Sequence, residues 1–260
     1  MAIDRSTATA HRTLLRIYAH APCVGQPPHL SDLRVLVVTD VLVRTAALSG
    51  RQSAVGLSLP DLPPDQVKAL GRNTDLLGIH QPIVQVGFRD VAAAVGGTAD
   101  VHVVGRGAVF DGDLAGARID VGPINATTGT TNPTSNGADS APAAGAALPA
   151  DPQTLRLALL SHAHEEPVDL TPEALAEAGR TLAHWRRQVA DWAKEPSTPM
   201  HAETVSTARA RFADDLDTAS VLVLLKDLAD AQGVSAGARF ETFVHLDRVL
   251  GLELSREVGY

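Results

Sequence analysis

Residues 122–150 constrain the fold more than any other stretch of this 260-residue chain. The segment, GPINATTGTTNPTSNGADSAPAAGAALPA, carries one charge at Asp139 and two large aliphatic residues, Ile124 and Leu148. Such a composition cannot bury enough apolar surface to offset the conformational entropy that ordering would cost. We therefore predict a flexible low-complexity linker that divides the chain into residues 1–121 and 151–260.

The first part alternates strand-type and helix-type patterns. Thr13–Ala19 predicts a buried strand, and Asp32–Leu48 predicts a helix with Ser31 as its N-cap. A further strand is expected at Asp100–Val104, so the order resembles βαβ units and indicates an α/β layer. The other expected elements are a turn at 57–64, helices at 65–77 and 88–95, and a strand at 108–110.

The second part is predicted to be helical throughout. Asp151-Pro152 and Thr171-Pro172 each place a capping residue before a proline at the first helical position. Apolar residues then recur at alternating spacings of three and four, which puts Trp185 and Trp192 in the core and leaves Arg186 on the solvated face. Later helices are expected at 202–212, 218–231 and 236–252, and together these predict an antiparallel bundle.

Charge and cysteine content exclude several classes of protein. The net charge is −8, with 30 acidic and 22 basic residues, which argues against a broad phosphate-binding surface for nucleic acid. The single cysteine, Cys23, excludes internal disulfides and multi-cysteine metal sites. Because no apolar run is long enough to span a bilayer and no secretory signal is visible at Met1–Ser6, we expect a cytoplasmic protein without a membrane partner.

The loop from His20 to His29 is the strongest candidate for a ligand site in the sequence itself. It joins a predicted strand to a predicted helix, which is where α/β folds bind ligands and where helix amides favour phosphate. His29 would lie one or two residues before the helix and could donate to an anionic oxygen. The alternative is a histidine that only packs or lies on the surface.

The stretch RIYAHAPCVGQPPHLSDLRVLVVTDVLVR, residues 16–44, resembles the first signature of cysteinyl-tRNA synthetases, which are class I aminoacyl-tRNA synthetases. Segments at 69–82, 109–121, 151–178 and 213–218 are similar to later family motifs in the same order. AEAGRTLAHWR at 176–186 and the last residues look more like the mycothiol-pathway cysteine ligases, which lack tRNA recognition. The matching positions of the first signature are Tyr18, Pro22, Val24, His29, Arg34, Val37, Val38, Asp40, Val41, Leu42 and Arg44.

This resemblance implies a class I synthetase-like Rossmann-type half, with residues 1–121 as a shortened nucleotide-binding domain. It implies ATP with Mg²⁺ as cofactor, Pro22, His29 and Ser31 as nucleotide-binding residues, and His29 and Asp32 as catalytic residues. The family motif His-Ile-Gly-His is here His29-Leu30-Ser31-Asp32. Asp32 would repel phosphate unless it held Mg²⁺, and the Cβ of Ser31 would crowd the adenine.

Two other family features are missing. The family binds the substrate thiol through zinc, and its first cysteine ligand aligns with His20, but the remaining ligand segments are absent, so no metal site is expected. The family's lysine loop has no counterpart either, because no lysine occurs between Lys68 and Lys194. The His162–Glu166 cluster aligns with a structural family segment, and we interpret it as a helix end.

Two functional hypotheses remain. The first is a non-catalytic paralogue that binds a small molecule or a protein partner, and the three lost features favour it. The alternative is an altered ATP-dependent, adenylate-forming amino-acid ligase, similar to the cysteine ligases. Recognition of tRNA is not expected, since neither an anticodon-binding domain nor a basic surface is apparent in the sequence.

Overall fold

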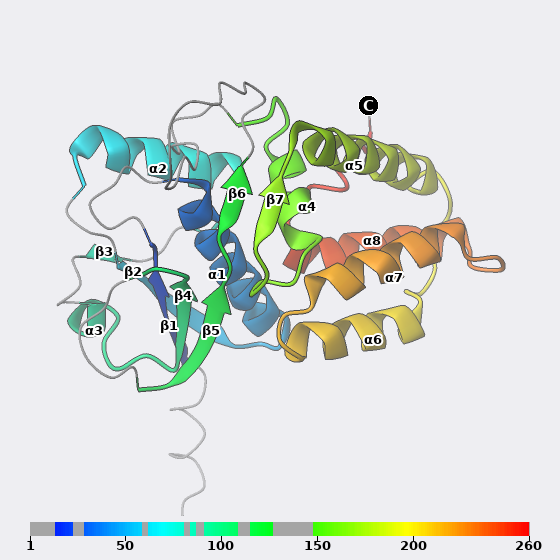
Figure 1. The fold of residues 1–260 in the computed structure, drawn as a ribbon. Helices are drawn as coiled ribbons and strands as arrows, with labels where there is room; N and C mark the ends of the chain where they lie inside the picture. Colours follow the sequence, from blue (N-terminus) through cyan, green and yellow to red (C-terminus); the bar gives the residue numbers. More distant parts are fainter. Residues whose placement is uncertain are drawn as a thin grey trace, which may run out of the picture. The chain divides into compact units, whose positions relative to one another are not determined.

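The computed structural model describes residues 14–22, 29–58, 62–80, 84–86, 91–108, 115–126 and 148–259 (Figure 1). The chain divides into two compact units. Within the described residues, the first unit holds the chain up to Asp75 together with Ile79–Pro123. The second holds Leu76–Gly78, Ile124–Ala126 and residues 148–259.

A parallel sheet forms the centre of the first unit. In the described part of the chain its strands are ordered β3-β2-β1-β4-β5, and every neighbouring pair is parallel. This is the doubly wound order, in which the direction of strand succession reverses between β1 and β4. The predicted Rossmann-type α/β class is therefore confirmed for this unit. The strands are β1 Leu14–His20, β2 Gln52–Ser58, β3 Val84–Val86, β4 Val101–Gly105 and β5 Ala117–Val121.

Helix α1, Leu30–Leu48, packs against β1, β2 and β4 and supplies much of the core of this unit. Its first twelve residues are buried, polar ones included, so its N-terminal half is enclosed on all sides. The other helices described in this unit are α2, Pro64–Leu76, and the short α3, Val91–Ala94. Because α1 follows β1 directly, its N-terminus faces the carboxyl edge of the sheet at the reversal point.

The sequence placed some boundaries wrongly. Helix α1 begins at Leu30 with His29, not Ser31, as its N-cap, because the Asp32 carboxylate binds the His29 amide. The turn expected at 57–64 starts too early, since Leu57 and Ser58 end β2, which pairs with both β1 and β3. Strand β5 was missed because most of it is exposed, so it lacks an apolar pattern. Ala108 follows β4 without forming a strand, and residues 109–110 lie outside the described residues.

The second unit contains the five helices expected there, at close to the predicted bounds. It also contains a short parallel sheet of β6, Ile124–Ala126, and β7, Val168–Leu170, so it is not helical throughout. That the helices form an antiparallel bundle stays a prediction. The helices are α4 Gln153–Leu160, α5 Pro172–Trp192, α6 Ala202–Ala213, α7 Thr218–Asp230 and α8 Ala236–Leu250.

The linker predicted at residues 122–150 was placed too early at its N-terminal boundary. Ile124–Ala126 forms β6 because its backbone pairs with β7, which satisfies its amides and carbonyls. The greater part of the predicted linker, residues 127–147, lies outside the described residues. None of the described helices is long and apolar enough to cross a membrane.

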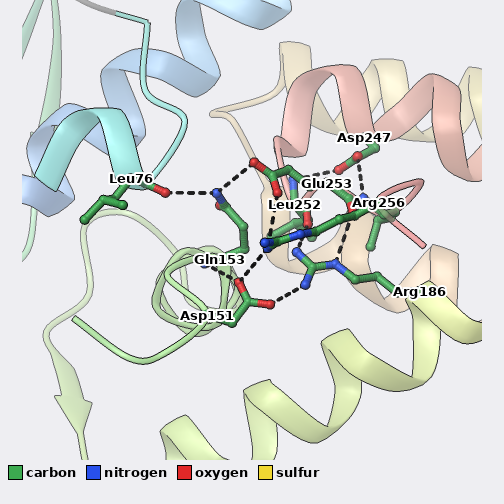
Figure 2. Close-up of polar contacts among 9 residues, drawn as sticks. Leu76, Asp151, Gln153, Arg186, Asp247, Leu252, Glu253 and Arg256 are labelled. Carbon is green, nitrogen blue, oxygen red and sulfur yellow. Dashed lines mark hydrogen bonds and ion pairs between the residues drawn. The ribbon is translucent and has the colours of Figure 1, made fainter. Parts of the chain in front are cut away.

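Two buried arginines, Arg156 and Arg186, fix the segment that follows α8, and Figure 2 shows the contacts of Arg186. Arg186 donates to the carbonyls of Leu252, at 2.8 Å, and Glu253, at 3.1 Å, and pairs with the Asp151 carboxylate. Arg156 donates to the carbonyls of Leu250 and Leu77. The expectation that Arg186 is solvated is therefore wrong. Its side chain is buried because unpaired carbonyls beyond the helix end need donors that water cannot supply there.

The close approach of β4 to the residues after β1 gives a stability prediction. A Cβ on Gly105 would lie 2.7 Å from Pro22 Cδ and 2.9 Å from Val35 Cγ2. We expect Gly105→Ala to lower the free energy of unfolding by about 1–3 kcal/mol through overpacking. Denaturant unfolding measures this change.

Gly71→Ala is the matched control, because Gly71 lies inside α2 with no atom within 4 Å of an added Cβ. This variant should be stabilised by about 0.5–1 kcal/mol, since alanine favours helix over glycine. A Gly105→Ala protein as stable as the parent would show that Pro22 and β4 do not pack as described.

Candidate functional site

The candidate site lies at the carboxyl edge of the first unit's sheet, at the reversal point between β1 and β4. Open α/β sheets bind ligands in the crevice outside this edge. The strand register places His20, the last residue of β1, opposite Ser58 of β2 and Val104 of β4. The N-terminus of α1 faces the same edge, so the side chains of three strands and one helix end gather there.

At the start of α1, His29 and Asp32 are brought together. The His29 backbone amide donates to Asp32 Oδ2 at 2.6 Å, and His29 Nδ1 lies 3.4 Å from the same oxygen. Asp32 is fully buried, whereas the His29 side chain keeps 22% of its surface exposed. The two predicted catalytic residues thus form a local cap, with a reachable imidazole over an enclosed carboxylate.

The Asp32 carboxylate lies where a bound anion would be expected. The first amides of a helix carry partial positive charge and have no partners within the helix, which is why phosphates bind there. In this chain Asp32 supplies a negative charge from within the first turn. The N-terminus of α1 is therefore already stabilised by the protein's own anion.

The two other predicted nucleotide-binding residues lie close by in different settings. Ser31 is buried in the first turn of α1 and retains 6% exposure. Pro22 follows β1 and lies close to Gly105 at the end of β4. The structure thus joins His29 to Asp32 by direct contact and places Pro22 against the neighbouring strand. Whether any of them binds a nucleotide stays a prediction.

A buried histidine pair, which the sequence did not reveal, lies beneath this edge. His20 Nε2 is 3.0 Å from His102 Nδ1, and His102 Nε2 is 3.2 Å from the Ala115 carbonyl. A carbonyl only accepts, so His102 Nε2 carries a proton. Neutral His102 then accepts at Nδ1, and His20 Nε2 is the donor. This assigns one tautomer to each ring and leaves His20 Nδ1 as an acceptor.

Burial keeps both imidazoles neutral at physiological pH. Desolvation lowers the pKa of His20 to about 4, and the proximity of His102, which opposes a second proton on the pair, and of the Arg118 charge acts in the same direction. Desolvation also lowers the pKa of His102, opposed in part by its hydrogen bond to the Ala115 carbonyl. The pair therefore offers uncharged donors and acceptors rather than positive charge.

A hydroxyl completes the polar groups along this edge. Ser58 is 1% exposed, and its Oγ has no hydrogen-bond partner within the described residues. A buried hydroxyl without a partner costs free energy, so a polar atom from a ligand or from water would stabilise it. The three strands thus contribute neutral polar groups, beside the acidic side chain of Asp32 and the basic side chain of Arg118.

The described residues around His20 do not assemble the zinc ligands that the resemblance implies. Across the described ranges, the side chains able to hold a metal together are His164, Glu165 and Asp215, at the other end of the chain. His20 has His102 beside it, and Cys23 lies outside the described residues. The expectation that zinc is absent stays a prediction.

Asp40, one of the positions that match the family signature, is buried and binds residues from two different segments. Its carboxylate accepts from Arg44 Nε at 2.7 Å and from the His80 backbone amide at 2.9 Å, and His80 Nδ1 is 2.7 Å from it. These contacts tie the middle of α1 to the residues that follow α2. We assign Asp40 a structural role, since its carboxylate is fully buried among these protein partners.

Comparisons with known proteins support the cysteine-ligase resemblance. The chain is 38% identical over 105 residues to L-cysteine:1D-myo-inositol 2-amino-2-deoxy-alpha-D-glucopyranoside ligase of Thermobispora bispora, covering 40% of this chain and 25% of that protein. The Streptosporangium roseum ligase of the same name is 35% identical over 109 residues, covering 40% of this chain and 26% of that protein. The Frankia casuarinae ligase is 40% identical over 93 residues, covering 34% and 19%.

The predicted resemblance to cysteine ligases is therefore confirmed. The similar region spans between 19% and 26% of the length of these three curated relatives, and no protein-family model matches the chain. The activity of the full-length relatives thus comes to this chain only as a proposal.

The histidine pair predicts how stability depends on pH. Because the pKa of His20 is about 4 when folded and 6.5 when unfolded, the unfolded chain binds more protons between these values. Stability should be complete above pH 6.5 and fall towards pH 4, with His20 contributing up to about 3 kcal/mol of the loss. In His20→Asn, which keeps a donor, the loss over this range should be smaller.

Denaturant unfolding at a series of pH values measures the difference. His184→Asn is the control, because His184 is exposed on α5, and its profile should follow the parent. If His20→Asn loses as much stability as the parent between pH 6.5 and 4, the buried neutral pair is not as described.

Proposed function

We propose that this chain is a cysteine-ligase-like protein that binds a small polar molecule at the carboxyl edge of its sheet without activating an amino acid with ATP. The similarity to cysteine ligases supports the scaffold, and the parallel sheet with its reversal point supports the location. In this proposal the chain binds its ligand at the same edge of the sheet as the family but does not form an adenylate.

The observation that carries the proposal is the buried Asp32 carboxylate at the start of α1. An incoming triphosphate would approach a like charge in a partly desolvated setting, where electrostatic repulsion is stronger than in water. It would also compete with Asp32 for the amides that make a helix N-terminus attractive to anions. Both effects oppose phosphate binding in the place where the resemblance would put it.

The sequence supplies little charge to compensate. The resemblance implies a lysine loop that neutralises the pyrophosphate leaving group, but no lysine lies between Lys68 and Lys194. Transfer of an adenylyl group depends on such preorganised positive charge. Arg118, whose charge acts on the pKa of His20, lies near the histidine pair, but it also pairs with Asp120 at 2.6 Å.

The edge itself suits a small, uncharged or cationic polar ligand. His20 and His102 are neutral, the Ser58 hydroxyl is buried, and Asp32 is an anion. A hydroxyl or amino group could bind such acceptors, whereas an anion gains nothing from them. Since all four side chains are enclosed, a small molecule could reach them more readily than the surface of a protein partner.

The alternative is an altered ATP-dependent amino-acid ligase, and the position of His29 favours it. This imidazole aligns with the first histidine of the family motif, is partly exposed and lies at the start of α1. In that case Asp32 would act as a Mg²⁺ ligand rather than as a barrier to phosphate. The two proposals therefore assign opposite roles to the same carboxylate.

Amino-acid-dependent ATP–pyrophosphate exchange separates the two proposals. We expect no exchange with any of the twenty amino acids and no thermal shift with Mg²⁺ and ATP, because Asp32 repels the phosphates. Robust exchange that is abolished by His29→Ala would establish the ligase instead. A His29→Ala protein that melts at the parental temperature makes that comparison valid.

The role of the Asp32 charge can be measured directly. Asp32→Asn keeps an acceptor for the His29 amide but removes the charge, so metal-free pyrophosphate should bind this variant measurably better than the parent. Asp65→Asn, which removes an acidic residue from the first turn of α2, is the control and should leave binding unchanged. Calorimetric titration at low salt provides the measurement; equal affinity in Asp32→Asn and the parent would remove the main support for the proposal.

A further inference from the structure

The second unit encloses a cavity of about 370 Å³ that the candidate site does not involve. Helices α4, α5 and α7 and strand β7 contribute its lining. Its volume falls within the range of small-molecule sites, which are mostly apolar with a few polar groups. Trp185 and Leu222 supply buried apolar surface, and Val223, 57% exposed, lies where the cavity opens.

The helix sequences explain why this space stays open. The lining includes Ala174 and Ala178 on α5 and Ala219 on α7. A larger lining residue lies about one turn from these alanines, as Leu222 does from Ala219. Small side chains on facing helices leave volume that larger ones would fill. The spacing of three and four along both helices puts these residues on the faces that border the cavity.

The charged groups of the lining differ in what they can still bind. Glu177 is paired with Arg180, and Asp169 accepts a hydrogen bond from Asn125 Nδ2 at 2.9 Å. Lys226 forms no ion pair within the described residues. Asp169 keeps its negative charge and further acceptor sites, because its partner Asn125 is a neutral donor. Lys226 is a cation of this lining without an ion pair among the described residues, and it lies one turn beyond the apolar pair Leu222 and Val223 on α7.

We propose that this cavity binds a small amphipathic carboxylate, whose apolar body lies against Trp185 and Leu222 and whose anionic group pairs with Lys226. Apolar contact supplies most of the affinity, and the lysine selects the charge of the headgroup. The site lies within the second unit, so it does not depend on what the edge of the sheet binds.

Decanoate, decanol and decylamine, each kept below its aggregation limit, test the proposal by calorimetric titration of the full chain. They share one apolar chain and differ in the charge of the headgroup. We expect decanoate to bind more tightly than decanol, and decylamine to bind most weakly. The tryptophan emission of a Trp192→Phe protein, which comes from Trp185 alone, should change on binding and so places the ligand in this cavity.

Two variants localise the site and assign the charge. Ala219→Phe should fill the space and abolish binding of both decanoate and decanol. Lys226→Met should weaken decanoate about fivefold and leave decanol unchanged, as expected for an ion pair near the surface. Lys194→Met is the control, because Lys194 is an exposed lysine paired with Asp191 outside the lining.

Several outcomes would overturn the proposal. These are the absence of decanoate binding, decylamine binding as tightly as decanoate, and equal losses in Lys226→Met and Lys194→Met. Unchanged binding in a folded Ala219→Phe protein would also overturn it. Because Lys226→Met alters an exposed side chain, it tests the charge even if Ala219→Phe does not fold.

Discussion

The enclosure of the start of α1 governs the chemistry of the first unit. Burying a helix N-terminus leaves amides that must find acceptors inside the protein. Asp32 satisfies the amide of His29 from within the first turn, and the surrounding core holds that carboxylate out of water. A residue that stabilises the helix in this way also sets the sign of the charge that the neighbouring site can accept, so fold and specificity share one side chain.

Local sequence patterns predicted the helices and one of their capping residues, which depend on neighbouring residues in the chain. Thr171 caps α5 as expected, and its side chain accepts from the Ala174 amide at 3.2 Å. The helices of both units appear near their predicted bounds, because amphipathic spacing and capping residues act within a few turns. Strands β2, β3, β5 and β7 were not predicted; β5 and β7 lack an apolar run of useful length, whereas β2 was overlooked although most of it is buried. The positions of β5 and β7 are fixed by pairing with β4 and β6, which the sequence does not display.

The residues of the candidate site also fall into those that local sequence predicted and those that it did not. His29 and Asp32 were predicted because they adjoin a strand-to-helix loop, a feature visible in the sequence. The pairing of His20 with His102 was not, since 82 residues separate them and the parallel register of β1 and β4 alone brings them together. An isolated histidine in an alternating strand such as Asp100–Val104 gives no signal of its partner. Arg186 was misplaced because its carbonyl acceptors follow α8, far along the chain.

Leu76–Gly78 belongs to the second unit, although the residues before and after it in the chain belong to the first. The Leu77 carbonyl accepts from the buried Arg156 guanidinium. The Leu76 carbonyl accepts from Gln153, as Figure 2 shows. The Leu76 and Leu77 carbonyls are synthesised well before Arg156, which donates to Leu77. The contact between Leu77 and Arg156 closes a loop of 79 residues. Loop closure of this length costs entropy before the contact forms. The second unit is therefore discontinuous in sequence, and it is completed only when a short segment that lies between residues of the first unit in the chain joins it.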